Sequence, residues 1–467
     1  MENRRLEEAV PSGADPTPAP ALFDRIGFAG FIVAVLFFAF LGGGITVLAD
    51  VFPARAMKDA YRGARAYYDK MVMSESPFLS GYWKTERTAR KGVTVNEPEA
   101  QPGYTLYSSG HGTVAYLVAL DGTVVHEWRL PFSAIYDPER SPIKNPMPDD
   151  FMHWNRTRLM PNGDLVVMFE TYGDTPWGYG LARLDKDSGI IGSYLGQTHH
   201  DFDIAGDGRI YVLTHEMRDK TYNNLRQIAV PRLDDAVTVL SPDGEELKEV
   251  FIMDVLVKSE YARLLDHISW FNNHDFIHTN AVEYITAEKA AVLPFASEGQ
   301  ILLSFRDVGA LAILGLGREK IVWARRGDWA GQHDPDVLPN GHILLFDNLG
   351  KFGPGGRSRI LEIDPQTSAE VWRYQGSAEA FFESDARASQ ERQPNGNTLV
   401  TEAHGGRLFE VTPDGRIVWE YINPRRATHP ESGDTIIPIM SWAQRVAPET
   451  LETAFQDHLV AHKSGRS

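Results

Sequence analysis

The sequence contains no cysteine among its 467 residues. Disulfides, thiolate metal ligands and a thiol nucleophile are therefore excluded. A long basic stripe is also missing from the globular part, and the formal net charge is −17. Because phosphate recognition needs concentrated Lys and Arg, we expect no nucleic-acid partner.

Long apolar runs are scarce, and the chain has one that stands out. Residues 26–49 read IGFAGFIVAVLFFAFLGGGITVLA without a charged residue, and about 20 apolar helical residues cross a bilayer core. The run is longer than the roughly 7–15 apolar residues of a cleaved signal peptide. We therefore predict an N-terminal tail over 1–24 and a retained transmembrane helix over 25–50.

Basic residues flank this run on both sides, so the orientation of the helix is open. Three precede it and five follow it: Arg4, Arg5 and Arg25, then Arg55, Lys58, Arg62, Arg65 and Lys70. Counted alone, they would leave the following domain in the cytoplasm. The helix lies where a signal anchor lies, however, so we expect a periplasmic domain.

Residues 53–75 are predicted to form a juxtamembrane helix or linker, because Ala56, Ala60, Ala64, Tyr67 and Tyr68 fall near one helical face. This segment is either a plain spacer or a docking surface. A membrane-protein partner is therefore a possibility that the sequence leaves open.

Short β-type runs and turn dipeptides repeat from about Tyr104 onward, which indicates a repeat fold. Strands broken by Pro-Asn-Gly or Asp-Gly recur, as in LMPNGDLVVMF, DIAGDGRIYVL, VLPNGHILLFDN and RQPNGNTLVTEA. Each is followed by a second hairpin, such as LFEVTPDGRIVWEY, and two hairpins make a four-stranded propeller blade. We predict an all-β, six-bladed β-propeller over residues 100–447, with a tail over 448–467.

Full blades are expected to begin near Phe151, Thr198, Asp275, Gly331 and Asp385. The segment near Thr113 supplies only an outer hairpin, so the C-terminal run IIPIMSWAQRV is expected to provide the missing inner strands of the first blade. WD40 signatures are absent. The recurrent tryptophans on outer strands are interpreted as packing between blades: Trp128, Trp323, Trp372 and Trp419.

Three histidines occupy matching positions in successive repeats: His200 in HDFDI, His278 in HTNAV and His333 in HDPDV. The innermost strands of a propeller line its channel, so we expect the three rings to face one space. Asp334 and Asp336 would disfavour an anionic substrate if they faced it, although strand alternation should turn one face away. Asn348, Glu402 and His404 are interpreted as ordinary polar turn residues.

These segments resemble the arylsulfotransferase family over roughly Tyr104 to Val446. The resemblance rests on HHDFDIAGDGRIYVL from His199, DFIHTNAVEY from Asp275 and ILLSFRD ending at Asp307, together with QHDPDVLPNGHILLFDN from Gln332 and QPNGNTLVTEAHGGRLFEVTPDGRIVWEY from Gln393. It implies a propeller that moves a sulfuryl group from an aryl sulfate to a phenolic acceptor through a sulfohistidine.

By this resemblance, His333 is the nucleophile, His278 and Asn280 match an H-x-N segment, Arg306 matches the arginine after the next strand, and His200 matches the histidine of the HHD segment. A neutral imidazole is a competent nucleophile, and a fixed guanidinium stabilises sulfuryl oxygens. We assign proton transfer to His278, or to His200. The reaction needs neither cofactor nor metal.

Other interpretations stay open. A membrane-tethered propeller without activity would serve as an accessory or binding subunit of a membrane complex. Three histidines at one level would also suit zinc or copper, although Arg306 is an awkward neighbour for a cation. A quinone-cofactor propeller would require a tryptophan-docking motif in every blade, which we do not find.

Overall fold

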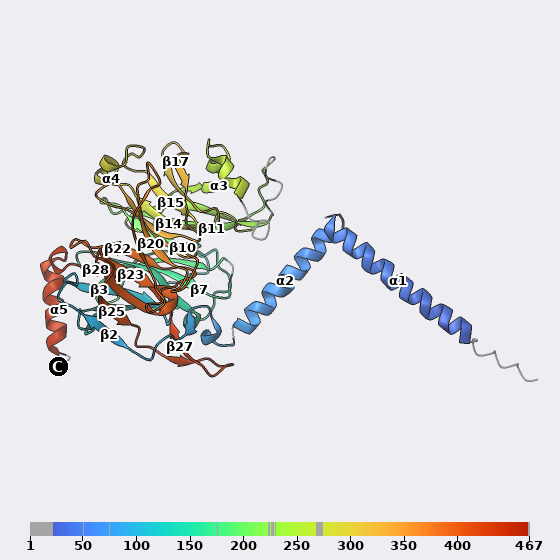
Figure 1. Cartoon of the computed structure of the whole chain (residues 1–467), viewed down its shortest axis with the longest axis horizontal. Coiled ribbons are helices and arrows are strands. Elements are labelled where there is room, and N and C mark those ends of the chain that lie inside the picture. The colour runs from blue at the N-terminus through green and yellow to red at the C-terminus, as the bar shows by residue number, and fades with distance from the viewer. Residues whose placement is uncertain are drawn as a thin grey trace, which may run out of the picture. The chain divides into compact units, whose positions relative to one another are not determined.

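The computed structural model describes residues 22–49, 51–73, 75–174, 176–222, 225, 228, 230–267 and 274–465. Most of the expected N-terminal tail lies outside these residues. The chain divides into two compact units, residues 1–71 and 72–467. The first contains helix α1 (Leu22–Leu48) and most of helix α2 (Ala54–Met73), drawn in blue in Figure 1.

Helix α1 contains one stretch, Gly27–Leu48, that is long and apolar enough to cross a membrane by length and composition. No side chain in its most apolar window is buried. A signal sequence would pass the same test. Length and composition therefore identify an apolar N-terminal helix that is either a membrane anchor or a signal sequence. Helix α2 lies where the sequence predicted a juxtamembrane helix.

The second unit is built from six antiparallel sheets of four or five strands, which we call blades. The first blade contains β28 (Met440–Val446), β3 (Tyr104–Ser109), β4 (Val114–Val118) and β5 (Val124–Arg129). The second contains β6 (Met152–Leu159), β7 (Leu165–Thr171), β8 (Gly178–Leu184) and β9 (Ile190–Tyr194). The third contains β10 (Thr198–Ile204), β11 (Ile210–Arg218), β12 (Arg232–Leu240) and β13 (Glu246–Phe251).

The other three blades continue in chain order. The fourth contains β14 (Thr279–Tyr284), β15 (Ile301–Phe305), β16 (Ala310–Gly315) and β17 (Lys320–Arg326). The fifth contains β18 (His333–Val337), β19 (Ile343–Asp347), β20 (Arg359–Ile363) and β21 (Glu370–Gln375). The sixth contains β22 (Ser389–Arg392), β23 (Thr398–Glu402), β24 (Arg407–Val411), β25 (Ile417–Ile422) and β2 (Gly92–Asn96). Short helices α3 (Ile252–Leu256) and α4 (Ala287–Val292) lie in insertions.

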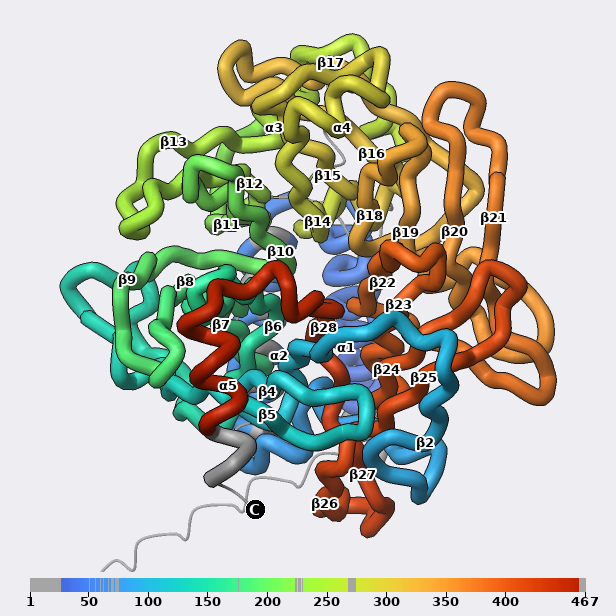
Figure 2. The backbone as a smooth tube through the Cα atoms, turned by 90° about the vertical axis from the view of Figure 1, so that its left-hand side faces the viewer, coloured from blue at the N-terminus to red at the C-terminus, as the bar shows by residue number. Residues whose placement is uncertain are grey.

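The innermost strands form a closed ring. Strands β28, β6, β10, β14, β18 and β22 contact one another in this order, and β22 returns to β28. Figure 2 shows these strands toward the middle, with β13, β17 and β21 at the rim. The sequence therefore predicted the all-β propeller correctly, and with it the strands that surround the axis.

The first blade is composite, but its make-up differs from the prediction. Only β28 comes from the C-terminal run, whereas β3 supplies the second strand from the N-terminal side. The residues IIP belong instead to β27 (Thr435–Pro438), which joins β1 (Trp83–Thr85) and β26 (Ala427–Thr428) in a small separate sheet. The turn dipeptide Pro102-Gly103 precedes YTLYSS, but the segment has no hairpin partner in the repeat pattern, so its pairing with β28 was not predicted.

Both ends of this unit are more ordered than the predicted boundaries suggested. Strand β2, before residue 100, pairs with β25 as a fifth strand of the sixth blade. Residues 453–465 form helix α5 (Thr453–Gly465), which packs on β5 (Figure 2). Phe455 and Leu459 of this helix join the core between the first two blades.

Outer-strand tryptophans join neighbouring blades, as expected. Trp128 donates its indole N–H to the carbonyl of Gly163, Trp372 to that of Pro413 and Trp419 to that of Leu120. Each acceptor lies in a hairpin turn of the next blade. A buried indole thus covers apolar area and satisfies its polar group across a blade boundary.

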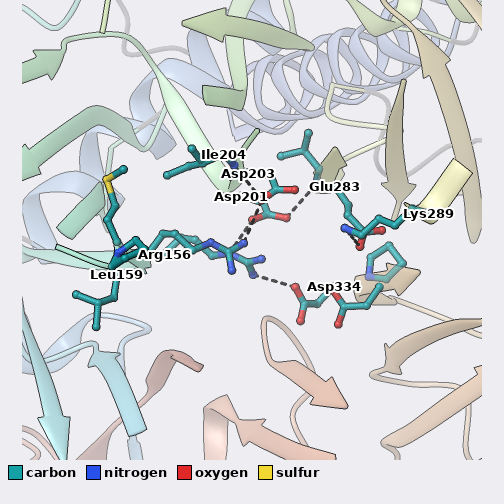
Figure 3. A pocket seen from close by; sticks show the side chains of 14 residues that line it. Arg156, Leu159, Asp201, Asp203, Ile204, Glu283, Lys289 and Asp334 are labelled. Atoms are coloured by element: carbon teal, nitrogen blue, oxygen red, sulfur yellow. Dashed lines mark hydrogen bonds and ion pairs between the residues drawn. The ribbon is translucent and has the colours of Figure 1, made fainter. Parts of the chain in front are cut away.

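An arginine on β6 bridges two other innermost strands across the axis. Arg156 Nε lies 2.8 Å from Asp201 Oδ1 on β10, and its NH1 lies 2.8 Å from Asp334 Oδ1 on β18 (Figure 3). Its guanidinium stacks on the ring of Trp442 at 3.3 Å. The three charged groups border a cavity of about 390 Å³, which Asp336 also lines.

Replacing Arg156 with Met should destabilise the propeller by about 3–5 kcal/mol, because it leaves the two buried carboxylates without their positively charged partner. Arg158→Met is the matched control: Arg158 pairs with Asp203 at 3.2 Å on the same two strands but is more exposed, and its loss should cost less than about 1 kcal/mol. Urea unfolding of the detergent-solubilised chain, followed by circular dichroism, measures both. Equal losses would contradict the bridging role of Arg156.

Candidate active site

The three predicted histidines lie at the same end of three adjacent innermost strands. His200 is in β10, His278 directly precedes β14, and His333 begins β18. Each strand has a register irregularity there: between Thr198 and Phe202, between Thr279 and Ala281, and between His333 and Asp336. Such bulges redirect side chains that a regular strand would alternate.

Backbone conformation supports this redirection. His200 and His278 have φ angles of 59° and 47°, and Asp334 has 51°. A non-glycine residue in the left-handed region costs roughly 1–3 kcal/mol and persists where surrounding contacts enforce it. The strained positions coincide with the histidine cluster.

The structure brings the three rings together. His278 Nε2 lies 3.2 Å from His200 Nε2, and the ring centroids of His200 and His333 are 6.5 Å apart. His278 and His333 are buried and His200 is half-buried. Trp177 packs against two of the rings: it is stacked with His278 and edge-on to His200.

Hydrogen bonds fix the tautomer of His333. Its Nδ1 lies 2.9 Å from the carbonyl of Gly331 and 2.8 Å from Asn348 Oδ1. Both partners are acceptors, because Asn348 Nδ2 donates to two other carbonyls. His333 therefore carries its proton on Nδ1, and its Nε2 lone pair accepts the backbone N–H of Arg387 at 3.2 Å.

The surroundings also keep His333 neutral. Burial, reinforced by the positive charge of Arg306, lowers its pKa to about 3. Burial and the neighbouring imidazoles likewise hold the pKa of His200 well below its ordinary value. At neutral pH the Nε2 of His333 is thus an unprotonated nitrogen.

A row of hydrogen-bonding imidazoles continues from His278. Its Nδ1 lies 2.5 Å from Asp275 Oδ2, and at the other end His200 Nδ1 lies 2.7 Å from His199 Nδ1. Although burial opposes it, the charge of His278 lowers the pKa of Asp275, so this carboxyl is ionised. The row offers a path for a proton along four side chains.

The two remaining predicted residues, Arg306 and Asn280, contact the backbone at or next to the histidines. Arg306 follows β15, and its backbone N–H donates to the carbonyl of His278 at 3.2 Å, while its Nε pairs with Asp307 at 2.6 Å. Its side chain is 26% exposed, and its positive charge acts on His333. Asn280 bonds the carbonyl of Gln332 at 2.7 Å rather than an imidazole, and thus ties β14 to the residue before His333.

Asn348 was wrongly interpreted as an ordinary turn residue. Its place at the end of a second strand had also suggested that it could rim the channel mouth, and it contacts His333 from there. Asp334 and Asp336 line the cavity around Arg156, so the concern that they oppose an anion at the histidines does not arise.

Sequence reasoning missed a second polar network beside the histidines. Arg387 pairs with Glu170 at 3.0 Å and donates to Asn155 Oδ1. Glu170 Oε1 in turn accepts the backbone N–H of His200 at 3.0 Å. The signal was present for Asn155: it lies eight residues before its turn glycine, Gly163, as His200 and His333 do before theirs.

Several solved structures are distantly similar to this chain. Distant structural similarity extends to a protein of unknown function from Bacteroides caccae (12% identity, 73% of this chain and 99% of that one, TM-score 0.43). It also extends to a streptogramin B lyase (11%, 79% and 100%, 0.39) and to the WD40 β-propeller domain of Doa1 (11%, 80% and 100%, 0.39). No curated protein matches the sequence.

A family model described as arylsulfotransferase (ASST) matches residues 156–424, which is more than half of the chain. The matched segment includes all three clustered histidines and Arg306. The chain belongs to the arylsulfotransferase family.

Proposed function

We propose that the protein transfers a sulfuryl group from an aryl sulfate ester to a phenolic acceptor through a sulfohistidine at His333. The observation that carries this proposal is the state of His333: a neutral ring, protonated at Nδ1, whose Nε2 lies beside two further imidazoles and Arg306. Membership of the family supplies the substrate class.

In the first half-reaction, the Nε2 lone pair attacks sulfur, and the bond between sulfur and the aryl oxygen breaks. The phenolate leaves with the bonding electrons and takes a proton. The hydrogen bond from the Arg387 backbone occupies the attacking lone pair at 3.2 Å, so substrate binding has to displace it. In the second half-reaction, a phenol oxygen attacks sulfur, the N–S bond breaks, and the phenolic proton returns to the enzyme.

His278 is the acid and base in this scheme. Asp275 accepts the Nδ1–H of His278 at 2.5 Å, which orients the ring for proton transfer. His200, at 3.2 Å, is the next group along the row. Asn280 acts indirectly, because its hydrogen bond holds the backbone next to the nucleophile.

Arg306 is the electrostatic partner of the sulfuryl oxygens. Its backbone is anchored to His278, and its partly exposed guanidinium influences His333. A preorganised cation at this place stabilises charge on the transferred group without reorganisation cost during reaction.

We further propose that α1 anchors the protein in a membrane with the propeller on the periplasmic side. The support is the length and apolar composition of Gly27–Leu48. Lack of turnover by the wild-type chain would favour the accessory-subunit alternative.

His333→Ala should abolish transfer, because it removes the nucleophile; we expect a fall in kcat of at least about 10³-fold. The measurement is release of nitrophenol from nitrophenyl sulfate with phenol as acceptor. His342→Ala is the control, since His342 lies in a hairpin of the same blade and pairs with Glu362. Unchanged turnover by the His333 variant would exclude it as nucleophile.

Arg306→Ala should lower kcat by about 10²–10³-fold, as removal of an oxyanion donor does elsewhere. Arg306→Lys should retain more activity, because it keeps the charge and loses only the planar fork. Steady-state kinetics of the two variants separate these effects. A change confined to KM would show that Arg306 binds ground state and transition state equally.

The imidazole of His333 should remain neutral from pH 8 to about pH 5, because burial lowers its pKa to about 3. Unfolded His333 takes up a proton near pH 6.5, so this residue lowers stability as pH falls below that value. Nitrogen-15 NMR of histidine-labelled protein measures the titration, with His333→Gln assigning the signal. A midpoint near 6.5 would contradict the burial described here.

A further inference from the structure

Three buried side chains lie behind the histidine row, on three adjacent strands of the third blade. They are His199 on β10, His215 on β11 and Asp235 on β12, and each is at most 3% exposed. His215 and Asp235 are direct cross-strand partners. The rings of His199 and His215 stack at 14°, with centroids 4.3 Å apart.

Three ring nitrogens of this group lack hydrogen-bond partners among the described residues. His199 Nε2 and both ring nitrogens of His215 are buried without a hydrogen bond. His199 Nε2 lies 3.6 Å from Asp235 Oδ1, too far for a hydrogen bond. Buried polar groups are nearly always paired, so unpaired nitrogens on two histidines beside one buried carboxyl group point to a missing ligand.

We propose that His199, His215 and Asp235 bind one divalent transition-metal ion, with zinc as the best fit. Each offers one ligand atom, and these atoms all lie within 4.8 Å of one another. Tetrahedral zinc with nitrogen ligands at about 2.0–2.1 Å needs ligand separations of about 3.3 Å. Binding therefore requires the ligand atoms to move closer and the two stacked rings to turn, so that both in-plane lone pairs point at the ion. A water molecule completes the set.

The surroundings hold the ligands in suitable orientations. Asp235 Oδ2 accepts the backbone N–H of Thr279 at 2.7 Å, which leaves Oδ1 toward the histidines. His199 Nδ1 is engaged with His200 Nδ1 at 2.7 Å, which leaves Nε2 for the ion. Contacts of this kind fix ring orientation in established metal sites.

The ion would also set the tautomer of His200, a consequence that rests on the proposed function. A metal on His199 Nε2 requires the proton on Nδ1, which then donates to His200 Nδ1. His200 must therefore carry its own proton on Nε2, where it faces His278. The ion is a structural partner of the histidine row and takes no part in bond making.

The test uses the full chain, purified in detergent with an affinity tag free of histidine, stripped with chelator and titrated with Zn²⁺ or Co²⁺ alone. We expect about one ion per chain and the visible absorption of tetrahedral Co²⁺. Binding should weaken at least about 10-fold in both His215→Gln and Asp235→Asn. Circular dichroism verifies that each variant is folded. If only one of the two variants folds, its loss of binding is sufficient for the test.

His153→Gln is the matched control. Like His215, His153 is fully buried and both of its ring nitrogens lack a hydrogen bond, but among the described residues it does not belong to the proposed ligand set. It should bind the ion like wild type. No stoichiometric binding by wild type, or equal binding by the His215 and Asp235 variants, would overturn the site. An inactive protein that binds one ion would refute the proposed function alone, and an active protein that binds none would refute the site alone.

Discussion

The bridge from Arg156 to Asp201 and Asp334 is the interaction on which the arrangement of the site depends. Each aspartate directly follows a clustered histidine, so the guanidinium anchors two bulged strands at the residues next to His200 and His333. A buried cation between two carboxylates is tolerated because each charge has a close partner. The same contact directs both carboxylates toward the cavity around Arg156 rather than toward the histidines.

Closure of the ring makes this bridge possible. Three innermost strands meet at Arg156 only because six blades surround one axis, and closure draws on both ends of the second unit: β28 enters the first blade and β2 covers the last. The tryptophan contacts across blade boundaries then fix the angular position of each sheet. The fold thus positions groups that are more than a hundred residues apart to within hydrogen-bonding distance.

Repeated hairpin signals predicted the propeller and its inner strands, because turn glycines and apolar alternation are local properties of the chain. Repeat position likewise predicted that His200, His278 and His333 would meet. Contacts from outside the repeat register were not predictable: Asn348 reaches His333 from a neighbouring turn, and Arg387 reaches it through a backbone N–H. Strand β3 was missed because its inner neighbour β28 comes from the other end of the chain, and helix α5 was missed because it lies outside the repeats.

Charge separates the two histidine groups of the third blade into different chemical roles. Arg306 and Arg387 stand near His200 and His333, where burial and these positive charges lower the pKa of the imidazoles, although each guanidinium is also paired with a carboxylate. Cations at this place favour a sulfuryl group. Near His199 and His215 stands the buried carboxylate of Asp235, which favours a cation. The 2.7 Å contact between His199 and His200 joins the two groups, so an ion bound at His199 as proposed would order the proton on His200 from the far side of that contact.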